Sequence, residues 1–114
     1  MYAVVTETSN DPSQRANVAN LDRELQSFLD QQPGCRGYLM IDKDDGGHVS
    51  IILWESKEIW DTAIHTEAHD QLLVRMRPLL TSRPVLYRGS VTTTDRQLAS
   101  RPACVAPGVP LLRT

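Results

Sequence analysis

The sequence lacks several features that would place it in a specialised class of proteins. No apolar run approaches the roughly 18 residues that a membrane-spanning helix needs. The N-terminal MYAVVTETSND has neither the positive flank nor the apolar run of a signal peptide. An excess of basic residues is also missing, since the net charge is −2 and the pI is near 5.8. We therefore expect neither a membrane nor a nucleic acid as a partner.

Cysteine is scarce as well. Cys35 and Cys104 lie far apart, and neither belongs to a CxxC motif or a Cys/His cluster. The sequence therefore offers no disulfide framework and no zinc ligand set. We expect two reduced thiols, which favours a cytoplasmic protein. Cys35 follows Gly34 with no histidine or lysine beside it to activate the sulfur, so we interpret it as a resting thiol.

The remaining totals are typical of one globular domain followed by a tail. A chain of 114 residues can bury a core but is too short for two domains. Its 40% hydrophobic and 23% charged residues are ordinary values for such a domain. From Thr94 onward the chain contains three prolines and no clear hydrophobic period. We therefore predict a domain over residues 1–95 and an extended C-terminal arm over residues 96–114.

Hydrophobic periodicity and turn signals predict the element order β-α-β-β-α-β. Asp45-Gly46 favours a tight hairpin turn, because such a turn requires positive φ. Ser56 can cap a second helix, and Thr66 can start a further helical segment after it. The predicted elements are a strand over 2–8, a helix from 12 to the QPG at 32–34, strands over 37–43 and 48–54, helices from 56 and 66, and a strand over 83–93. This order is the ferredoxin-like α+β arrangement, a four-stranded antiparallel sheet with its helices on one face.

The first predicted helix is amphipathic. Asp11 is the expected N-cap, Pro12 fits the first helical position, and Gln14 completes a variant of the capping box. One face carries the apolar stripe Val18, Leu21, Leu25, Phe28 and Leu29. The polar face that we expect opposite this stripe carries Asp22, Arg23, Gln26 and Asp30.

The central hairpin is apolar on both faces of the predicted sheet. Ser50, Ile52 and Trp54 alternate along one strand with Val49, Ile51 and Leu53, and the partner strand alternates Tyr38 and Met40 with Leu39 and Ile41. A sheet with helices on one face and water on the other would alternate apolar with polar residues. The chain has no further element large enough to cover the second face. We therefore predict a homodimer in which two sheets pack face to face.

The stretch QPGCRGYLMIDKDDGGHVSIILWESKEIWDTAIHTEAH resembles the antibiotic-biosynthesis monooxygenase family of dimeric α+β barrel proteins. That family has a P-G-x-x-G-Y/F strand opening, a hairpin, and a strand that ends in W-x-S before the second helix. The matching residues are Pro33, Gly34, Gly37, Tyr38, Trp54 and Ser56. The resemblance covers roughly residues 1–95 and implies the ferredoxin-like fold and the dimeric α+β barrel.

The resemblance also implies an activity. Members include monooxygenases that oxidise aromatic polyketide phenols without a metal or flavin cofactor, because the deprotonated substrate itself reduces O₂ in a dry pocket. The expected ligand is therefore a small aromatic or quinol-type compound. Trp54 matches the tryptophan that lines the pocket, Ser50 stands where an asparagine is usual, and Trp60 stands where a tyrosine is usual. Tyr38 and Arg75, the latter as the closest match to a pocket arginine, complete the expected pocket residues.

Two other readings of the resemblance remain open. A non-catalytic small-molecule-binding or stress-related protein could use the same pocket, and Ser50 in place of the asparagine favours this reading. Haem degradation is less favoured, because that branch uses an asparagine on the first strand and a tryptophan on the second helix. Thr6 or Glu7 stands at the first position and Ala63 at the second, and only a histidine is retained.

His65 and His69 are the candidate catalytic residues. Their spacing of four can put two metal ligands on one helix face, but the order H-T-E-A-H differs from the H-E-x-x-H of zinc proteases. Thr66 can also break the helix between them, and no further ligands are arranged around them, so we predict no metal site. Either histidine could instead be the base that deprotonates the substrate, because histidine titrates near neutral pH. We predict that one of them reaches a cavity bounded by Trp54 and the second helix.

Overall fold

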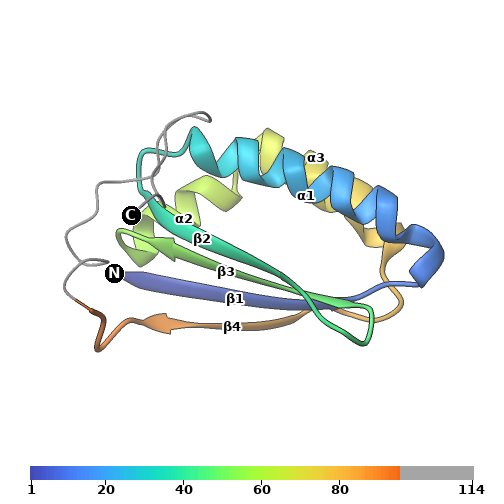
Figure 1. The fold of residues 1–114 in the computed structure, drawn as a ribbon. Coiled ribbons are helices and arrows are strands. Elements are labelled where there is room, and N and C mark those ends of the chain that lie inside the picture. The colour runs from blue at the N-terminus through green and yellow to red at the C-terminus, as the bar shows by residue number, and fades with distance from the viewer. Residues whose placement is uncertain (96–114) are drawn as a thin grey trace.

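The computed structural model describes residues 1–95, so the predicted arm over residues 96–114 lies outside the described part of the chain. Figure 1 shows a sheet of long strands covered by helices on one side. The elements are β1 (Tyr2–Ser9), η1 (Pro12–Gln14), α1 (Arg15–Asp30), β2 (Cys35–Asp42), β3 (Gly47–Trp54), α2 (Lys57–Ile64), α3 (Glu67–Met76), η2 (Arg77–Leu79) and β4 (Val85–Ser90).

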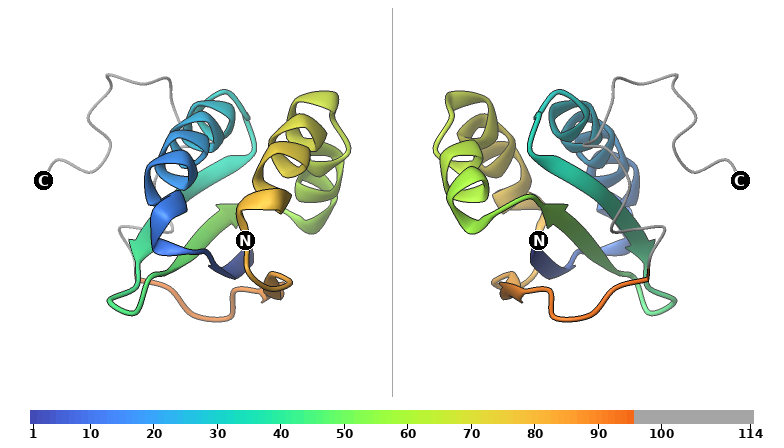
Figure 2. Two further views of the ribbon diagram at one scale, coloured as in Figure 1. Left: turned by 90° about the vertical axis from the view of Figure 1, so that its right-hand side faces the viewer. Right: turned by 90° about the vertical axis from the view of Figure 1, so that its left-hand side faces the viewer.

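The four strands form one antiparallel sheet in the order β2-β3-β1-β4. Because β1 lies between β3 and β4, the first strand of the chain is central in the sheet. The helices α1, α2 and α3 all lie on the same face of the sheet, as the end-on views in Figure 2 show. The predicted ferredoxin-like α+β fold is therefore confirmed.

The helix starts are fixed by the side chains that the sequence indicates. The carboxylate of Asp11 accepts a hydrogen bond from the backbone N–H of Ser13 at 2.9 Å. Ser56 Oγ accepts from the N–H of Ile59 at 3.2 Å and begins α2. Thr66 Oγ1 accepts from the N–H of His69 at 3.3 Å and begins α3. Each cap satisfies a backbone N–H that has no partner inside its helix. The predicted break at Thr66 is therefore present.

The last strand is shorter than predicted. We expected a strand over 83–93, whereas β4 covers Val85–Ser90. β4 pairs only with β1, whose residues Tyr2 to Glu7 lie opposite Ser90 to Val85. The next amide, that of Val91, donates to the carbonyl of Met1 at 2.9 Å, where the partner strand ends. At this end the ladder stops because β1 offers no partner residue beyond Met1. At its other end β4 begins at Val85, opposite Glu7, although β1 continues to Ser9.

The core lies between the helix-facing side of the sheet and the helices. It contains Tyr2, Val4, Leu29, Cys35, Ile52, Trp54, Trp60 and Ala63, with Leu25, Phe28, Tyr38, Met40, Ile59 and Ile64 packed against it. Leu29 and Cys35 are the most completely buried side chains. The rings of Tyr2 and Trp60 lie 5.5 Å apart between centroids and join β1 to α2. Burial of these aromatic groups contributes much of the stabilisation of this layer.

The opposite face of the sheet is apolar and open to solvent. The strand registers place Leu39, Ile51, Val5 and Tyr87 in one row across all four strands. Leu39 is 58% exposed and Tyr87 is 59% exposed, at the two ends of this row. No helix or strand within residues 1–95 covers this face (Figure 2). The expected second apolar face is therefore present, on the side of the sheet away from the helices.

Candidate functional site

A cavity of about 830 Å³ lies between the sheet and the helices. Strand alternation explains its floor, because residues two apart on a strand face the same side. From β3 these residues are His48, Ser50, Ile52 and Trp54, and from β1 they are Val4, Thr6 and Thr8. The helices contribute Asp22, Leu25, Phe28, Leu29, Trp60, Ile64, His69, Leu73 and Met76. Leu86 and the segment that precedes β4 complete the lining.

The two ends of this cavity differ in polarity. Trp54 and Trp60 line one end together with Ile64, whereas His48 lies at the other end with Asp22 and Thr8. His48 and Trp54 are six residues apart on one strand, so the lined length is about 20 Å at about 3.3 Å per residue. The cavity is therefore an elongated groove with an aromatic end and a polar end.

The two tryptophans form much of the aromatic end. Trp54 is 2% exposed, and its Nε1 has no hydrogen-bond partner among the described residues. The ring of Trp60 packs at an angle of 42° against that of Tyr2, and the guanidinium carbon of Arg88 lies 4.8 Å from the centre of the Trp60 ring. A buried indole N–H without a partner carries a desolvation cost. The bonding capacity of this N–H is therefore unused within residues 1–95.

His69 lines the cavity, as does Trp54. Its Nδ1 is buried and has no hydrogen-bond partner in the described part of the chain. Burial lowers the pKa of His69 below its ordinary value, because the imidazolium would lose its hydration. At neutral pH the ring is therefore neutral, the form in which an imidazole can act as a base.

His65 lies outside the cavity. Its side chain is 70% exposed, and Nδ1 lies 2.6 Å from the carbonyl oxygen of Asp61. His65 ends α2, whereas His69 belongs to α3, so the two histidines do not share one regular helix. Within residues 1–95, no group of three or more His, Cys, Asp or Glu side chains is arranged to hold a metal ion.

The other expected pocket residues fall into two groups. Ser50, Trp54 and Trp60 line the cavity, and Ser50 is only 7% exposed. Tyr38 and Arg75 do not line it. The hydroxyl of Tyr38 donates to Asp30 at 2.8 Å. The guanidinium of Arg75 donates to both carboxylate oxygens of Glu24, at 2.7 and 2.6 Å, on the surface between α3 and α1.

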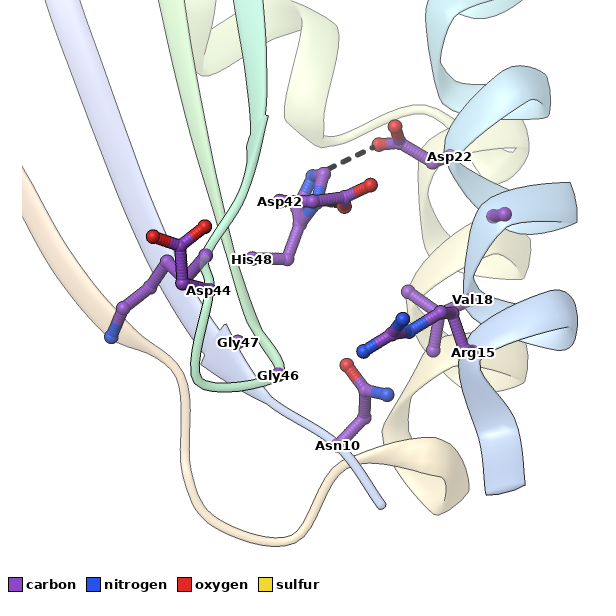
Figure 3. A pocket seen from close by; sticks show the side chains of 11 residues that line it. Asn10, Arg15, Val18, Asp22, Asp42, Asp44, Gly46, Gly47 and His48 are labelled. Carbon is purple, nitrogen blue, oxygen red and sulfur yellow. Dashed lines mark hydrogen bonds and ion pairs between the residues drawn. The ribbon is translucent and has the colours of Figure 1, made fainter. Parts of the chain in front are cut away.

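His48 and Asp22 are cavity residues that the sequence did not single out. The prediction that Asp22 belongs to the solvated face of the first helix was wrong. Its side chain is 14% exposed, and its Oδ1 lies 3.3 Å from Nε2 of His48 (Figure 3). The nearest sequence signal is strand alternation, which puts His48 on the same face as Ser50 and Trp54. Asp22 could not be found in this way, because it comes from a distant helix.

His48 is held between two carboxylates. Nδ1 lies 3.1 Å from Oδ1 of Asp42, which is directly opposite His48 in the hairpin. Asp22 and then Asp42 raise the pKa of His48 above its ordinary value, because both stabilise the imidazolium. The same cluster borders a smaller, polar pocket of about 350 Å³, which Arg15 and Lys43 also line (Figure 3). His48 and His69 therefore face one groove with pKa values shifted in opposite directions.

The fold and the cavity define a ferredoxin-like α+β protein with a ligand-sized groove under its helices. The sequence model of the antibiotic biosynthesis monooxygenase family matches residues 1–73, which is more than half of the chain. The chain belongs to this family. Membership supports a monooxygenase-like role, and the resemblance of the PG…GY and W-x-S motifs to this family is thereby confirmed.

Solved structures agree with this assignment at the level of the fold. An antibiotic biosynthesis monooxygenase is 21% identical, with a TM-score of 0.75, over 82% of this chain and 100% of that chain. Rv0793 from Mycobacterium tuberculosis is 20% identical, with a TM-score of 0.72, over 82% and 96% of the two chains. A variant of SnoaB, a cofactor-independent oxygenase from Streptomyces nogalater, is 16% identical, with a TM-score of 0.73, over 82% and 94%.

Two further comparisons concern relatives and the membrane. No curated protein resembles the chain closely enough to count as a match. Among the helices of residues 1–95, none has the length and apolar character needed to cross a bilayer.

Proposed function

We propose that this protein is a monooxygenase that oxidises a small aromatic or quinol-type compound in the groove, without a metal or flavin cofactor. The observation that carries this proposal is the position of His69. Its neutral ring, with an unpartnered Nδ1, faces a largely apolar cavity that Trp54 and Trp60 also line. Such a site can bind an aromatic ring, remove a proton from it and exclude water.

The chemistry balances without an external reductant. His69 Nδ1 accepts a proton from an acidic C–H of a methylene group between aromatic rings. The resulting anion passes one electron to O₂, and the two radicals combine to form a C–O bond. His69 returns its proton to the peroxide. Loss of the remaining C–H proton and cleavage of the O–O bond then give a carbonyl group and one water.

The histidine is suited to this step by its surroundings. Burial has the largest effect on the pKa of His69 and lowers it, so the ring is neutral at the pH where a base is needed. Exclusion of water from the site favours the reaction between the aromatic anion and O₂. Ser50 and the Nε1 of Trp54 are two polar groups that would orient an oxygen atom of the substrate.

The proposed assembly is a homodimer. The row from Leu39 to Tyr87 and the neighbouring apolar residues of the same face form a surface that a second copy can cover sheet to sheet. Such a contact is isologous, because the same face is used by both copies. A cytoplasmic location and the arm over 96–114 remain predictions from the sequence.

A second candidate function is binding without catalysis. This function is favoured by Ser50, which stands where the polyketide-oxidising members have an asparagine. The groove therefore lacks one polar side chain that those members have. In this case the groove would hold an aromatic compound, and His69 would only border it.

Oxygen consumption with a panel of anthrones and hydroquinones separates the two functions. The enzyme is expected to consume O₂ with at least one of these compounds while remaining colourless and metal-free. The His69→Gln variant should lose at least about 100-fold in rate, the usual contribution of a general base. His65→Gln is the matched control, because His65 is exposed outside the groove. Ligand binding without O₂ uptake by any compound would support the binding protein instead.

A further inference from the structure

The polar end of the groove contains hydrogen-bonding groups that the proposed oxidation does not use. His48 and Asp22 both line the groove, and their side chains are 12% and 14% exposed. They come from β3 and α1, so they connect the floor of the groove to its helical wall. Nothing in the proton transfer by His69 requires them.

The contact between the two residues leaves bonding capacity on both. Nε2 of His48 lies 3.3 Å from Oδ1 of Asp22 but has no hydrogen-bond partner of good geometry among the described residues. Nδ1 is already engaged by Asp42 at 3.1 Å. The other carboxylate oxygen of Asp22 accepts from the side-chain amide of Gln26 at 3.3 Å. The pair can therefore offer one N–H donor and one carboxylate acceptor side by side.

We propose that His48 and Asp22 are a specificity-determining pair that binds a neutral hydroxyl group at the end of the groove remote from the tryptophans. This inference rests on the proposed function, since it takes the groove as the ligand site. A hydroxyl oxygen can accept from Nε2 of His48 while its proton is donated to Asp22. Hydrogen bonds that involve charged partners are the stronger ones, so the pair can discriminate between ligands.

The charges around His48 and Asp22 favour a neutral hydroxyl group over a carboxylate or an amine. A carboxylate would lie beside Asp22 and within the influence of Asp42, which repel it. Arg15 and Lys43, at the adjoining pocket, offset part of this repulsion but lie on the far side of the pair from the groove. An amine would carry its positive charge toward the imidazolium of His48. A neutral hydroxyl avoids both costs and satisfies both partners, so a hydroxylated ligand is favoured.

The length of the groove sets the shape of the ligand. The His48 and Trp54 positions are about 20 Å apart along β3. A molecule that reaches both ends is therefore elongated, with an aromatic body at the tryptophans and a hydroxyl-bearing end at His48. Several fused or linked rings fit this description better than a single ring.

Binding can be measured separately from turnover. Anthraquinones lack the methylene group that would be oxygenated, and quenching of Trp54 and Trp60 reports their entry into the groove, since these are the two tryptophans of the chain. The probes are 2-(hydroxymethyl)anthraquinone, 2-methylanthraquinone and anthraquinone-2-carboxylate, whose three-ring body fills roughly half of the groove length and can therefore occupy its polar half. We expect the hydroxymethyl compound to bind about tenfold more tightly than the methyl compound, the effect of about one hydrogen bond to a charged group. The carboxylate should bind at least about tenfold more weakly than the alcohol.

Variants assign the preference to the pair. Asp22→Asn and His48→Gln should each reduce the preference for the alcohol to about twofold or less, a reduction that loss of one hydrogen bond explains. Asp22→Asn should also weaken the discrimination against the carboxylate. His65→Gln should retain the wild-type values. Because the first comparison uses the wild-type protein, a variant that fails to fold does not prevent the test.

The outcomes separate this inference from the proposed function. Equal binding of the alcohol and the methyl compound by the wild-type protein would overturn the hydroxyl site alone. Failure of all three probes to bind would overturn both the groove as ligand site and the hydroxyl site. A preference for the alcohol that disappears in both variants, in a protein that consumes no O₂ with any substrate, would support the hydroxyl site and overturn the oxygenase.

Discussion

Gly34 lies against the side chain of Ile59, with no space for a side chain of its own. A Cβ atom at position 34 would lie 2.1 Å from Cγ2 of Ile59. Gly34 is buried between α1 and β2, and its carbonyl accepts from the N–H of Glu55 at 2.8 Å. The glycine of the PG motif therefore allows the start of β2 to approach the first turn of α2.

The Gly34→Ala variant should consequently be less stable than the wild type. The extra methyl group forces Ile59 or the backbone to move, which costs about 1–3 kcal/mol in the free energy of unfolding. Urea denaturation measures this value. Gly89→Ala is the control, because a Cβ there meets nothing within 4 Å, and it should change stability by less than about 0.5 kcal/mol. Equal effects of the two variants would contradict the close contact.

The histidines of the groove should titrate in opposite directions. We expect NMR titration to give a pKa above about 6.5 for His48 and below it for His69, since carboxylates stabilise the first imidazolium and burial destabilises the second. Asp22→Asn should lower the pKa of His48 more than Asp42→Asn does, because Asp42 is exposed to solvent. A His48 pKa that neither variant alters would contradict the ion pairs.

The raised pKa of His48 also makes stability depend on pH. The stabilisation that the His48–Asp22 ion pair gives the folded state is complete below the unfolded-state pKa of about 6.5. It is lost as the pH rises through the higher folded-state pKa. The charged groups around His48 are Asp22 on α1, Asp42 on β2, and Arg15, Lys43 and Asp44 at the adjoining pocket. The difference in unfolding free energy between wild type and His48→Gln should therefore shrink as the pH rises above about 6.5. Using this difference removes the opposing contribution of His69, which is present in both proteins.

The exposed face of the sheet should determine the oligomeric state. Tyr87→Glu places a charge in the apolar row, so we expect it to convert a dimer into a monomer in size-exclusion chromatography with light scattering. Val74→Glu is the matched control, since Val74 is 60% exposed but lies on α3, on the other side of the molecule. A wild-type monomer at micromolar concentration would contradict the dimer.

Arg75 should have little influence on either ligand binding or stability. Its bidentate contact with Glu24 lies on the exposed surface, where such pairs contribute little and are screened by salt. We expect Arg75→Gln to leave the affinity for anthraquinones unchanged and to produce a small change in the urea midpoint that decreases further at high salt. A large loss of ligand affinity in this variant would contradict the placement of Arg75 outside the groove.

The sequence predicts the elements of this fold well because their signals are local. Asp11, Ser56 and Thr66 cap their helices through contacts within three residues, and the alternation along β3 separates its two faces correctly. The C-terminal limit of β4 depends instead on where β1 begins, which is a property of another strand. Prediction therefore worked where the causes lie within one element.

The site illustrates the same distinction. Trp54 and Ser50 could be assigned to one strand face from their spacing, and they do line the groove. His48 shares this face, but its importance comes from Asp22, which belongs to a helix and was assigned to the solvent side. Arg75 and Tyr38 were expected in the pocket, and the structure pairs them with Glu24 and Asp30. Contacts between distant elements, which decide these cases, leave no spacing signal in one sequence.

The central place of β1 has a consequence for how the chain folds. Residues Tyr2–Ser9 precede both of their partner strands along the chain, and the later of these, β4, ends at Ser90. During synthesis on the ribosome, nearly the whole domain must be made before β1 can pair with both β3 and β4. Its contacts are therefore long-range in sequence, which slows folding and prolongs the exposure of an unpaired strand. A chain interrupted before β4 would retain an open edge on β1, and we expect such a fragment to aggregate.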